Sequence, residues 1–294
     1  METVPAKSIV YHDSKGASWF GGDYKMNIYR GCNHGCIYCD SRSDCYQNPD
    51  FDIVKAKENA LSIIRDDLRR KVKTGVIMTG STSDPYNPFE KDILLSRHAL
   101  EFIYAYGFGV GIATKSPLIT RDIDILRDIQ AFSPVIIKIT ITCVDDDLAK
   151  KLEPAAPSSS SRFAALKELR DNGVYAGILL MPVMPFISDT EENILGIVEK
   201  AKACGVRFIY PGFGVTMRSG QREHMYRRFD ESLPGMKEKY MRTFGDEYSC
   251  GIPNHKHIWS KFKAACDDAG ILYRMSDIIK SYKQGYSGNQ LSLL

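Results

Sequence analysis

Three of the eight cysteines in this 294-residue chain are crowded into one short segment, at Cys32, Cys36 and Cys39. Gly31 and Gly35 lie in the same segment and permit a tight loop. Three thiols in one glycine-containing loop can close around a single metal centre. The segment therefore limits the chain to folds that can present such a loop next to a functional site.

Three interpretations of the crowded cysteines remain open at this point. They could be buried packing residues, although such crowding is unusual for a loop. They could hold structural zinc, which takes four ligands, and His34 or Cys45 could then supply the fourth. They could instead hold three irons of a cubane iron–sulfur cluster and leave its fourth iron open for another ligand. The spacing favours the cluster.

The composition is that of an ordinary folded protein. Apolar residues make up 44%, aromatic residues 11%, and the formal net charge is only +3, which argues against disorder and against a field that attracts polyanions. No stretch approaches the ~20 apolar residues of a membrane helix, and residues 1–16 contain no apolar signal-peptide core. We expect a cytoplasmic protein with reduced cysteines and no membrane partner.

Alternating strand-like and helix-like patterns predict an α/β fold. Helical spacing of apolar residues separates the strand-like runs, which implies βαβ crossovers and a parallel sheet. The runs cover residues 24–29, 75–78, 110–114, 135–142, 174–181 and 206–210. We predict a partial (β/α)6 TIM-like barrel with a helical C-terminal extension. The expected boundaries are an N-terminal extension at 1–23, the barrel at 24–215, the helical extension at 216–283 and a flexible tail at 284–294.

The starts of two helices and the ends of two helices are also predicted. Asp189 with Glu192 forms a capping box ahead of an apolar helical pattern, and the serines at 158–161 are expected to cap the helix that follows them. Gly173 and Gly205 are placed where helices should end before strands.

The cysteine spacing, with Tyr38 directly before Cys39, resembles the signature of the radical S-adenosylmethionine (SAM) superfamily. Residues 27–39 resemble the branch that contains spore photoproduct lyase and its "DNA repair photolyase" relatives. Further segments are similar to the same branch: residues 79–88, residues 152–154 followed by Pro157 and Arg162, and residues 181–185 with Asp189. The resemblance runs from about Asn27 to Pro211.

This resemblance implies the cofactors and the chemistry. Cys32, Cys36 and Cys39 would hold a [4Fe-4S] cluster whose open iron binds SAM. One electron, supplied by a donor of flavodoxin or ferredoxin type, would cleave SAM to methionine and a 5′-deoxyadenosyl radical. That radical would abstract hydrogen from an unreactive C–H bond. The same resemblance implies the partial barrel already predicted from the strand pattern.

Ligands of parallel α/β sheets collect beyond the carboxyl ends of the strands. Lys115, after the third strand, is our candidate for the SAM carboxylate because an ammonium suits a point-charge contact. Ser83 and Thr140 are candidates for the amino group and ribose, and Tyr38 would contact adenine through its backbone. The full set of expected cofactor-binding residues is Tyr38, Ser81, Ser83, Asp84, Lys115, Thr140, Thr142 and Met184.

The chain departs from spore photoproduct lyase at two positions. The resemblance aligns Ser81 with the cysteine that donates hydrogen in that enzyme, and a hydroxyl O–H bond is too strong for the task. Asp40 replaces a tyrosine that follows the last cluster cysteine there. We therefore expect a different reaction from the splitting of spore photoproduct. Cys143, after the fourth strand, is a candidate substitute thiol, although a packing role is the alternative.

The C-terminal region carries a basic excess. Residues 206–283 contain 14 Lys and Arg against 9 Asp and Glu. Arg218, Arg222, Arg227 and Arg228 are interleaved with Tyr226 and Phe229, a combination that suits a nucleic-acid backbone and an unstacked base. A solvated helix face with core aromatics is the alternative. Cys250, His255, His257 and Cys266 could be read as a second metal site, but a surface loop before a helix explains them better.

The last five residues, from Gln290 to Leu294, resemble the short tails by which repair proteins dock on the DNA sliding clamp. Together these features favour a radical SAM enzyme that acts on a nucleic acid, in DNA repair or base modification. Two alternatives remain. One is a radical SAM enzyme acting on a protein or small molecule, and the other is a non-catalytic, metal-stabilised binding protein.

Overall fold

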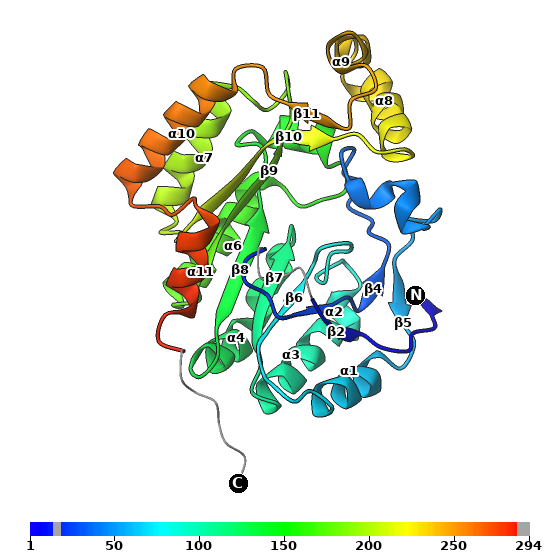
Figure 1. Ribbon diagram of the computed structural model, residues 1–294, viewed down its shortest axis with the longest axis vertical. Helices are drawn as coiled ribbons and strands as arrows, with labels where there is room; N and C mark the ends of the chain where they lie inside the picture. The colour runs from blue at the N-terminus through cyan, green and yellow to red at the C-terminus, as the bar shows by residue number, and fades with distance from the viewer. Residues whose placement is uncertain (14–18, 287–294) are drawn as a thin grey trace.

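The computed structural model describes residues 1–13 and 19–286, and its largest element is an eight-stranded sheet. The strand order is β11-β10-β9-β8-β7-β6-β3-β2. The strands are β2 (Val10–His12), β3 (Tyr24–Met26), β6 (Val76–Thr79), β7 (Gly109–Thr114), β8 (Val135–Thr140), β9 (Ala176–Val183), β10 (Ile209–Thr216) and β11 (Ser249–Gly251). The run from β3 to β10 is parallel, and the outermost strands pair antiparallel. The predicted α/β partial barrel with six parallel strands is confirmed (Figure 1).

The first predicted strand is divided in two. After Met26 the chain leaves the main sheet, and β4 (Tyr29–Arg30) pairs antiparallel with β5 (Lys55–Lys57). A parallel pairing of β5 with β1 (Glu2–Val4) completes a small second sheet. The last parallel strand also differs, because β10 continues past the predicted end at Tyr210. Its additional residues pair with β11, a partner that lies far along the sequence.

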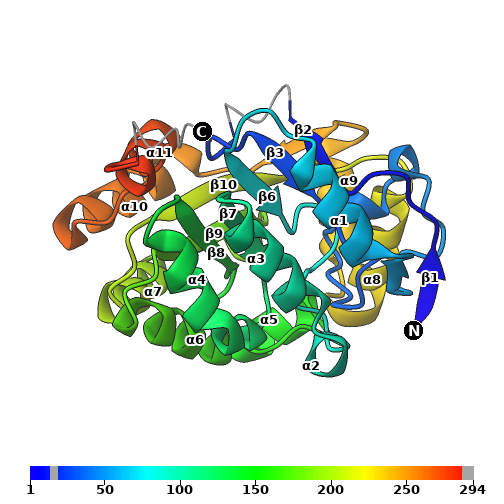
Figure 2. The same ribbon diagram turned by 90° about the horizontal axis from the view of Figure 1, so that it is seen from below.

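Helices cover the outer face of the main sheet, as Figure 2 shows from below. Isoleucine, leucine and valine side chains from the outward face of the strands pack against these helices in the largest apolar cluster of the described residues. The covering helices are α1 (Ala60–Arg69), α2 (Glu90–Ile93), α3 (Leu95–Ala105), α4 (Ile123–Gln130), α5 (Asp146–Leu152), α6 (Ser159–Asp171), α7 (Glu191–Ala203) and α10 (His255–Ala269).

The helix boundaries largely follow the predicted signals. The Ser158 side chain accepts a hydrogen bond from Ser161 N and caps α6, as predicted. Gly173 and Gly205 adopt positive φ values of 78° and 65° directly after α6 and α7. The predicted capping box at Asp189 is wrong by one residue. Thr190 is the N-cap of α7 and its hydroxyl accepts from Asn193 N.

A separate apolar cluster closes the inner face of the sheet near the amino ends of its strands. Phe20 is fully buried in this cluster. It packs against Phe208, which directly precedes β10, and against Met78 of β6. Helix α11 (Met275–Lys283) packs against this cluster, and Tyr282 Oη donates to Phe20 O at 2.6 Å. In Figures 1 and 2, α11 lies on the side of the sheet opposite α4 and α6.

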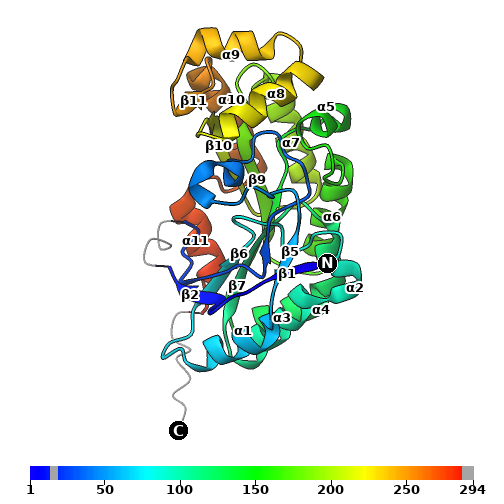
Figure 3. The same cartoon turned by 90° about the vertical axis from the view of Figure 1, so that its right-hand side faces the viewer.

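Helices α8 (Gln221–Ser232) and α9 (Met236–Phe244) stand at the other end of the molecule, beside β11 (Figure 3). Their apolar residues, among them Met225, Phe229 and Tyr240, share a cluster with Cys36, Tyr38 and Met184. The C-terminal helices therefore pack directly against the loop that carries the cysteines. None of the helices in the described part of the chain is long and apolar enough to cross a membrane.

Candidate active site

The cysteine loop begins directly after β4 and is held on both sides by backbone hydrogen bonds. Gly31 has φ +80°, and a Cβ there would lie 2.3 Å from Ile53 O, so only glycine fits the start of the loop. Cys32 N donates to Phe51 O at 2.7 Å. Farther along, Ile37 N donates to Leu152 O at 2.9 Å. The loop is thus fixed between the small sheet and the end of α5.

The three thiols lie close enough to influence one another electrostatically. Burial raises the pKa of Cys32 to about 11, and the pKa of Cys36 and of Cys39 to about 12. Each thiolate also raises the pKa of a neighbouring cysteine. A bound cationic metal centre would favour the thiolate forms, as metal binding to cysteine requires.

The donor set fits an iron–sulfur cluster better than a single zinc ion. Among the residues that the structure describes, no three His, Cys, Asp or Glu side chains are arranged to hold one metal ion. A cubane binds each cysteine through a different iron, so its ligands need not converge on one point. Asn33 Oδ1 and His34 Nδ1, in the same loop, are buried without a hydrogen-bond partner. Buried polar atoms normally have partners, so the loop is incomplete without a bound group.

The two candidates for a fourth zinc ligand, His34 and Cys45, lie in different environments. His34 Nε2 pairs with Asp84 Oδ2 at 2.8 Å. Cys45 is exposed, and its sulfur accepts from Arg218 Nη1 at 3.3 Å. Cys45 is therefore committed to Arg218, whereas His34 keeps its Nδ1 unpaired, so the preference for a cluster over zinc depends on the spacing of the three cysteines.

Asp84 ties the cysteine loop to the ends of two parallel strands. Its carboxylate receives Thr114 Oγ1 at 2.6 Å, Lys115 N at 2.8 Å and Tyr86 N at 2.8 Å, in addition to His34. Burial alone would raise its pKa, but His34 and these hydrogen bonds hold the pKa down, at about 2. Protein groups occupy both oxygens of Asp84, so in this structure the carboxylate links the cysteine loop to the strand ends.

The carboxyl ends of the parallel strands form the mouth of the barrel. Glu153 is the second carboxylate there, and several predicted residues lie close to it. Tyr38 Oη donates to Glu153 Oε1, and Thr142 Oγ1 lies 3.4 Å from the same oxygen. Lys115 Nζ lies 4.0 Å away and 5.6 Å from the centre of the Tyr38 ring. Arg162, which is 1% exposed, forms an ion pair with Glu153 Oε2 at 2.5 Å. The Arg162 and Lys115 cations outweigh the effect of burial and lower the pKa of Glu153.

The positive charge of Lys115 lowers the pKa of both Cys36 and Cys39. Burial lowers the pKa of Lys115, but Cys36 and Glu153 raise it more strongly, and the net shift is upward. Its ammonium therefore stays charged beside the cysteines. This position suits both roles open to it, which are to offset cluster charge and to pair the SAM carboxylate.

The other predicted residues lie around the same mouth in different environments. Ser83 is buried, and its hydroxyl donates to Tyr29 O at 3.0 Å. Thr140 is buried at the end of β8, and its carbonyl accepts from Arg162 Nη1 at 2.9 Å. Met184 is fully buried beside the cysteine loop, whereas Ser81 is exposed.

Cys143 has no exposed surface. Burial raises the pKa of its thiol to about 12, and it packs in the same cluster as Cys36 and Met184. This placement fits a packing role, which was the alternative to a hydrogen-donor role.

Most of the basic and aromatic side chains that were expected to contact a nucleic acid have partners within the protein. Phe229 is fully buried and Tyr226 packs against the same cluster, so neither ring is free to stack on a base. Arg222 donates to the carbonyls of Gly245, Met217 and Glu247, and Arg228 pairs with Glu231. The suggested second metal site is not formed either. Cys250 and Cys266 are buried in different clusters, and His257 pairs with Glu191 at 2.9 Å.

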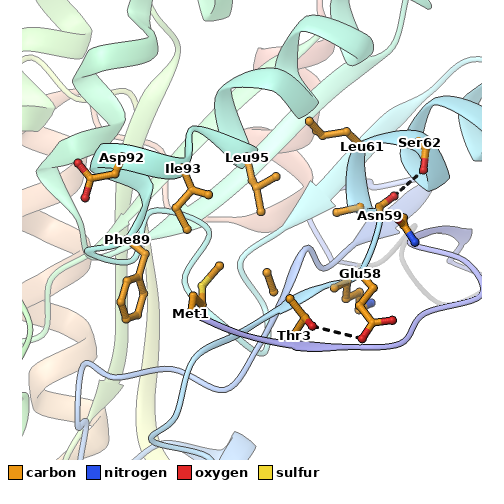
Figure 4. A pocket seen from close by; sticks show the side chains of 13 residues that line it. Met1, Thr3, Glu58, Asn59, Leu61, Ser62, Phe89, Asp92, Ile93 and Leu95 are labelled. Atoms are coloured by element: carbon orange, nitrogen blue, oxygen red, sulfur yellow. Dashed lines mark hydrogen bonds between the residues drawn. The ribbon is translucent and has the colours of Figure 1, made fainter.

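Arg218 instead lies at the rim of the mouth, in a cavity of about 760 Å³ lined also by Cys45, Met217 and Tyr248. Its guanidinium lies 5.5 Å from the centre of the Tyr248 ring, which is 54% exposed. Another cavity, of about 650 Å³, lies on the outer surface between β1 and the start of α1 (Figure 4). None of the predicted site residues lines that second cavity, so it is not part of this site.

The pairing of Glu153 with Arg162 was not predicted. Both residues belong to segments that resemble the radical SAM branch, but nothing local indicates that they meet. Their proximity depends on the turn between α5 and α6, which brings Arg162 back under the strand ends.

The fold and the cysteine loop agree with the comparison of this chain with known families. Residues 26–201 match the family model described as "Radical SAM superfamily". This match covers more than half of the chain, which therefore belongs to the radical SAM superfamily. Enzymes of this family use a [4Fe-4S] cluster and SAM, and the residues at the mouth fit both.

Individual relatives extend the comparison. The protein Rv2578c of Mycobacterium tuberculosis is 29% identical over 231 residues, which cover 75% of this chain and 67% of the relative. MJ0683 of Methanocaldococcus jannaschii is 35% identical over 174 residues, or 58% of this chain and 64% of that protein.

Solved structures show the same fold. A variant of spore photoproduct lyase with bound AdoMet and dinucleoside spore photoproduct superimposes with a TM-score of 0.66 at 14% identity, over 90% of this chain and 79% of that one. The radical SAM methyltransferase TsrM from Kitasatospora setae, with tryptophan bound, gives a TM-score of 0.58 at 10% identity, over 89% of this chain and 58% of that one.

Proposed function

We propose that this radical SAM enzyme acts on a nucleic acid and repairs or modifies a base. The observation that carries the proposal is the rim beside the cysteine loop. There the Arg218 guanidinium lies over the exposed Tyr248 ring and forms no ion pair with a carboxylate of the described residues. Tyr46, 40% exposed, is close enough to Arg218 to interact with it electrostatically. The Arg218 guanidinium donates to Cys45 Sγ and Tyr248 Oη but to no carboxylate of the described residues, which leaves its charge for a phosphate, and exposed rings suit unstacked bases.

The residues at the mouth have distinct tasks in this proposal. Cys32, Cys36 and Cys39 would hold the cluster, and Lys115 would pair the SAM carboxylate. Glu153 would orient Lys115 and Tyr38, while Asp84 would fix the loop. When bound, the cluster and SAM supply a 5′-deoxyadenosyl radical. The likeness to a structure of spore photoproduct lyase with a bound dinucleoside supports a nucleotide substrate, but Ser81 and the buried Cys143 argue for a different reaction.

The first experiment asks whether DNA changes cofactor chemistry. The anaerobically reconstituted enzyme is given SAM and dithionite, and 5′-deoxyadenosine is measured with and without single-stranded, duplex and ultraviolet-damaged DNA. We expect at least one of these DNAs to change the rate at low salt. If no form of DNA alters the rate, the nucleic-acid proposal fails.

The rim itself is tested by Arg218→Gln, with Arg228→Gln on α8 as the control. Loss of one phosphate contact should weaken DNA binding and reduce the slope of log K against log salt by about 1. Arg228 is already paired with Glu231, so its replacement should leave the slope close to wild type. Equal slopes in all three proteins would count against this rim.

The clamp-binding tail lies outside the described residues, and its role is a proposal from sequence. Deletion of the five residues from Gln290 to Leu294 should abolish binding to a bacterial sliding clamp while iron content stays unchanged. The measurement is clamp binding by surface plasmon resonance. Binding that survives the deletion would contradict the proposal.

A further inference from the structure

Lys138 is a buried cation on the inner face of the barrel that the site described above does not use. It extends from β8 and is 2% exposed. Its neighbours in register are Ala113 of β7 and Gly177 of β9, whose small size leaves room for the lysine chain. Nζ lies 3.4 Å from Met78 Sδ and 4.9 Å from the centre of the Phe20 ring.

The ammonium has no partner of opposite charge among the described residues. A thioether is a weak acceptor, and an aromatic face replaces hydration only in part. An ammonium has three donors, and buried unpaired charges are costly. A methionine or leucine would pack at this position without that cost, so packing alone gives no reason for a lysine here.

Phe20, whose ring lies next to the Lys138 ammonium, has a strained backbone conformation. Phe20 has φ +50°, an uncommon value for a residue with a side chain. Its backbone is secured by α11, through Phe20 N to Met275 Sδ at 3.2 Å and Tyr282 Oη to Phe20 O at 2.6 Å. Strained backbone that is braced in this way is typical of functional positions.

Several side chains on the inner face around Lys138 are only partly buried. Ala113, Met181 and Tyr210 pack against the same apolar cluster as Met78 but are only partly buried. Trp19, 39% exposed, packs against Tyr210 with ring centres 5.4 Å apart. Lys138 precedes Thr140 on the same face of β8, so a group entering between the strand ends would pass Thr140 and reach the ammonium.

We propose that Lys138 binds an anionic oxygen of the substrate, a carboxylate or a phosphate, at the base of the barrel's inner face. Such a group would supply both the missing charge and the missing acceptors. The inference depends on the radical SAM fold, which places reactive chemistry at the mouth above, and it does not require a nucleic acid.

The test is anion-dependent stability of the cluster-loaded protein. Melting temperatures are measured in acetate and in inorganic phosphate, each against chloride at matched ionic strength and slightly acidic pH. Wild type is compared with Lys138→Met and with Lys167→Met, a surface control on α6. A ligand that binds only the folded state raises the Tm, by about 3 °C at a tenfold excess over its Kd.

We expect the anion-specific shift in wild type and in Lys167→Met and its loss in Lys138→Met. A shift with acetate alone would assign a carboxylate, and a shift with phosphate alone would assign a phosphate. An equal shift in Lys138→Met, or no shift in wild type, would overturn the inference. Because the assay contains no nucleic acid, its failure is separate from failure of the proposed function.

Discussion

Glu153 and Lys138 are both buried ionisable side chains, but among the described residues only Glu153 has partners of opposite charge. Glu153 lies between Arg162 and Lys115 and accepts hydrogen from Tyr38. Removal of one member of such a buried pair leaves an uncompensated charge. Lys138 already has this uncompensated state, since burial lowers its pKa to about 7 and no neighbouring charge opposes the shift.

The shift at Lys138 predicts a specific dependence of stability on pH. Below pH 7 the amine is charged in the folded and unfolded states, and the folded state bears the full cost of burying the charge. Between about 7 and the ordinary value of 10.5 the folded protein binds fewer protons than the unfolded chain, so stability rises with pH. The other titratable groups in its cluster are Tyr175, Tyr210 and Tyr282, and burial raises the pKa of Tyr175 and Tyr282.

Lys138→Met should therefore be more stable than wild type near pH 7, by several kcal/mol at roughly 1.4 kcal/mol per pKa unit. The advantage should shrink as pH rises toward 10.5, because the wild-type amine becomes neutral in both states. Urea unfolding of the two proteins at several pH values measures the difference. A difference that stays constant over this range would contradict the prediction.

The backbone segments before and after the cysteine loop determine its position. The chain leaves the main sheet after β3, forms β4, and turns at Gly31 so that Cys32 N can reach Phe51 O. The carbonyl of Ile53 blocks any Cβ at Gly31. Backbone geometry, and not the cysteines alone, therefore determines where the thiols lie.

Gly31→Ala should prevent assembly of the cluster, since the new Cβ would force the loop away from residues 51–53. Gly173→Ala is a matched control, because Gly173 has a similar φ of 78° but no atom within 4 Å of its would-be Cβ. The control should lose only about 1 kcal/mol of stability and keep its cluster. Iron and sulfide per chain are the measurement. A full cluster in Gly31→Ala would show that the loop tolerates displacement.

At the scale of the whole molecule, the C-terminal helices complete the site. Gln221 Nε2, at the start of α8, donates to Tyr38 O at 2.8 Å across 183 residues of sequence. Ser219 Oγ donates to Asp44 just beyond the cysteines at 2.6 Å. These contacts join the region that carries the basic rim to the loop that carries the thiols.

Gln221→Leu should therefore weaken retention of the cluster, because the Tyr38 carbonyl loses its buried donor, a loss that costs about 1–3 kcal/mol. Glu231→Gln, an exposed change on the same helix, is the control. The rate at which visible cluster absorbance is lost to a chelator should rise in the first variant only. Identical rates in both variants would show that α8 does not stabilise the loop.

The features that could be predicted from sequence are those encoded by neighbouring residues. The spacing of Cys32, Cys36 and Cys39 indicated the family, and the apolar patterns indicated six parallel strands. The side chains at the strand ends, such as Lys115 and Thr142, could be expected to lie near one mouth because parallel strands end at the same edge.

Tertiary structure alone decided which groups meet there. Glu153 joins Arg162, Tyr226 and Phe229 turn inward, and β11 lengthens the sixth parallel strand, each through contacts between distant segments. Lys138 is the one charged residue in the strand Val135–Thr140, and only the packed barrel shows that its ammonium has no counter-ion among the described residues. The physical reason is that local periodicity reflects the backbone geometry of one element, whereas burial and charge compensation depend on every element packed around a side chain.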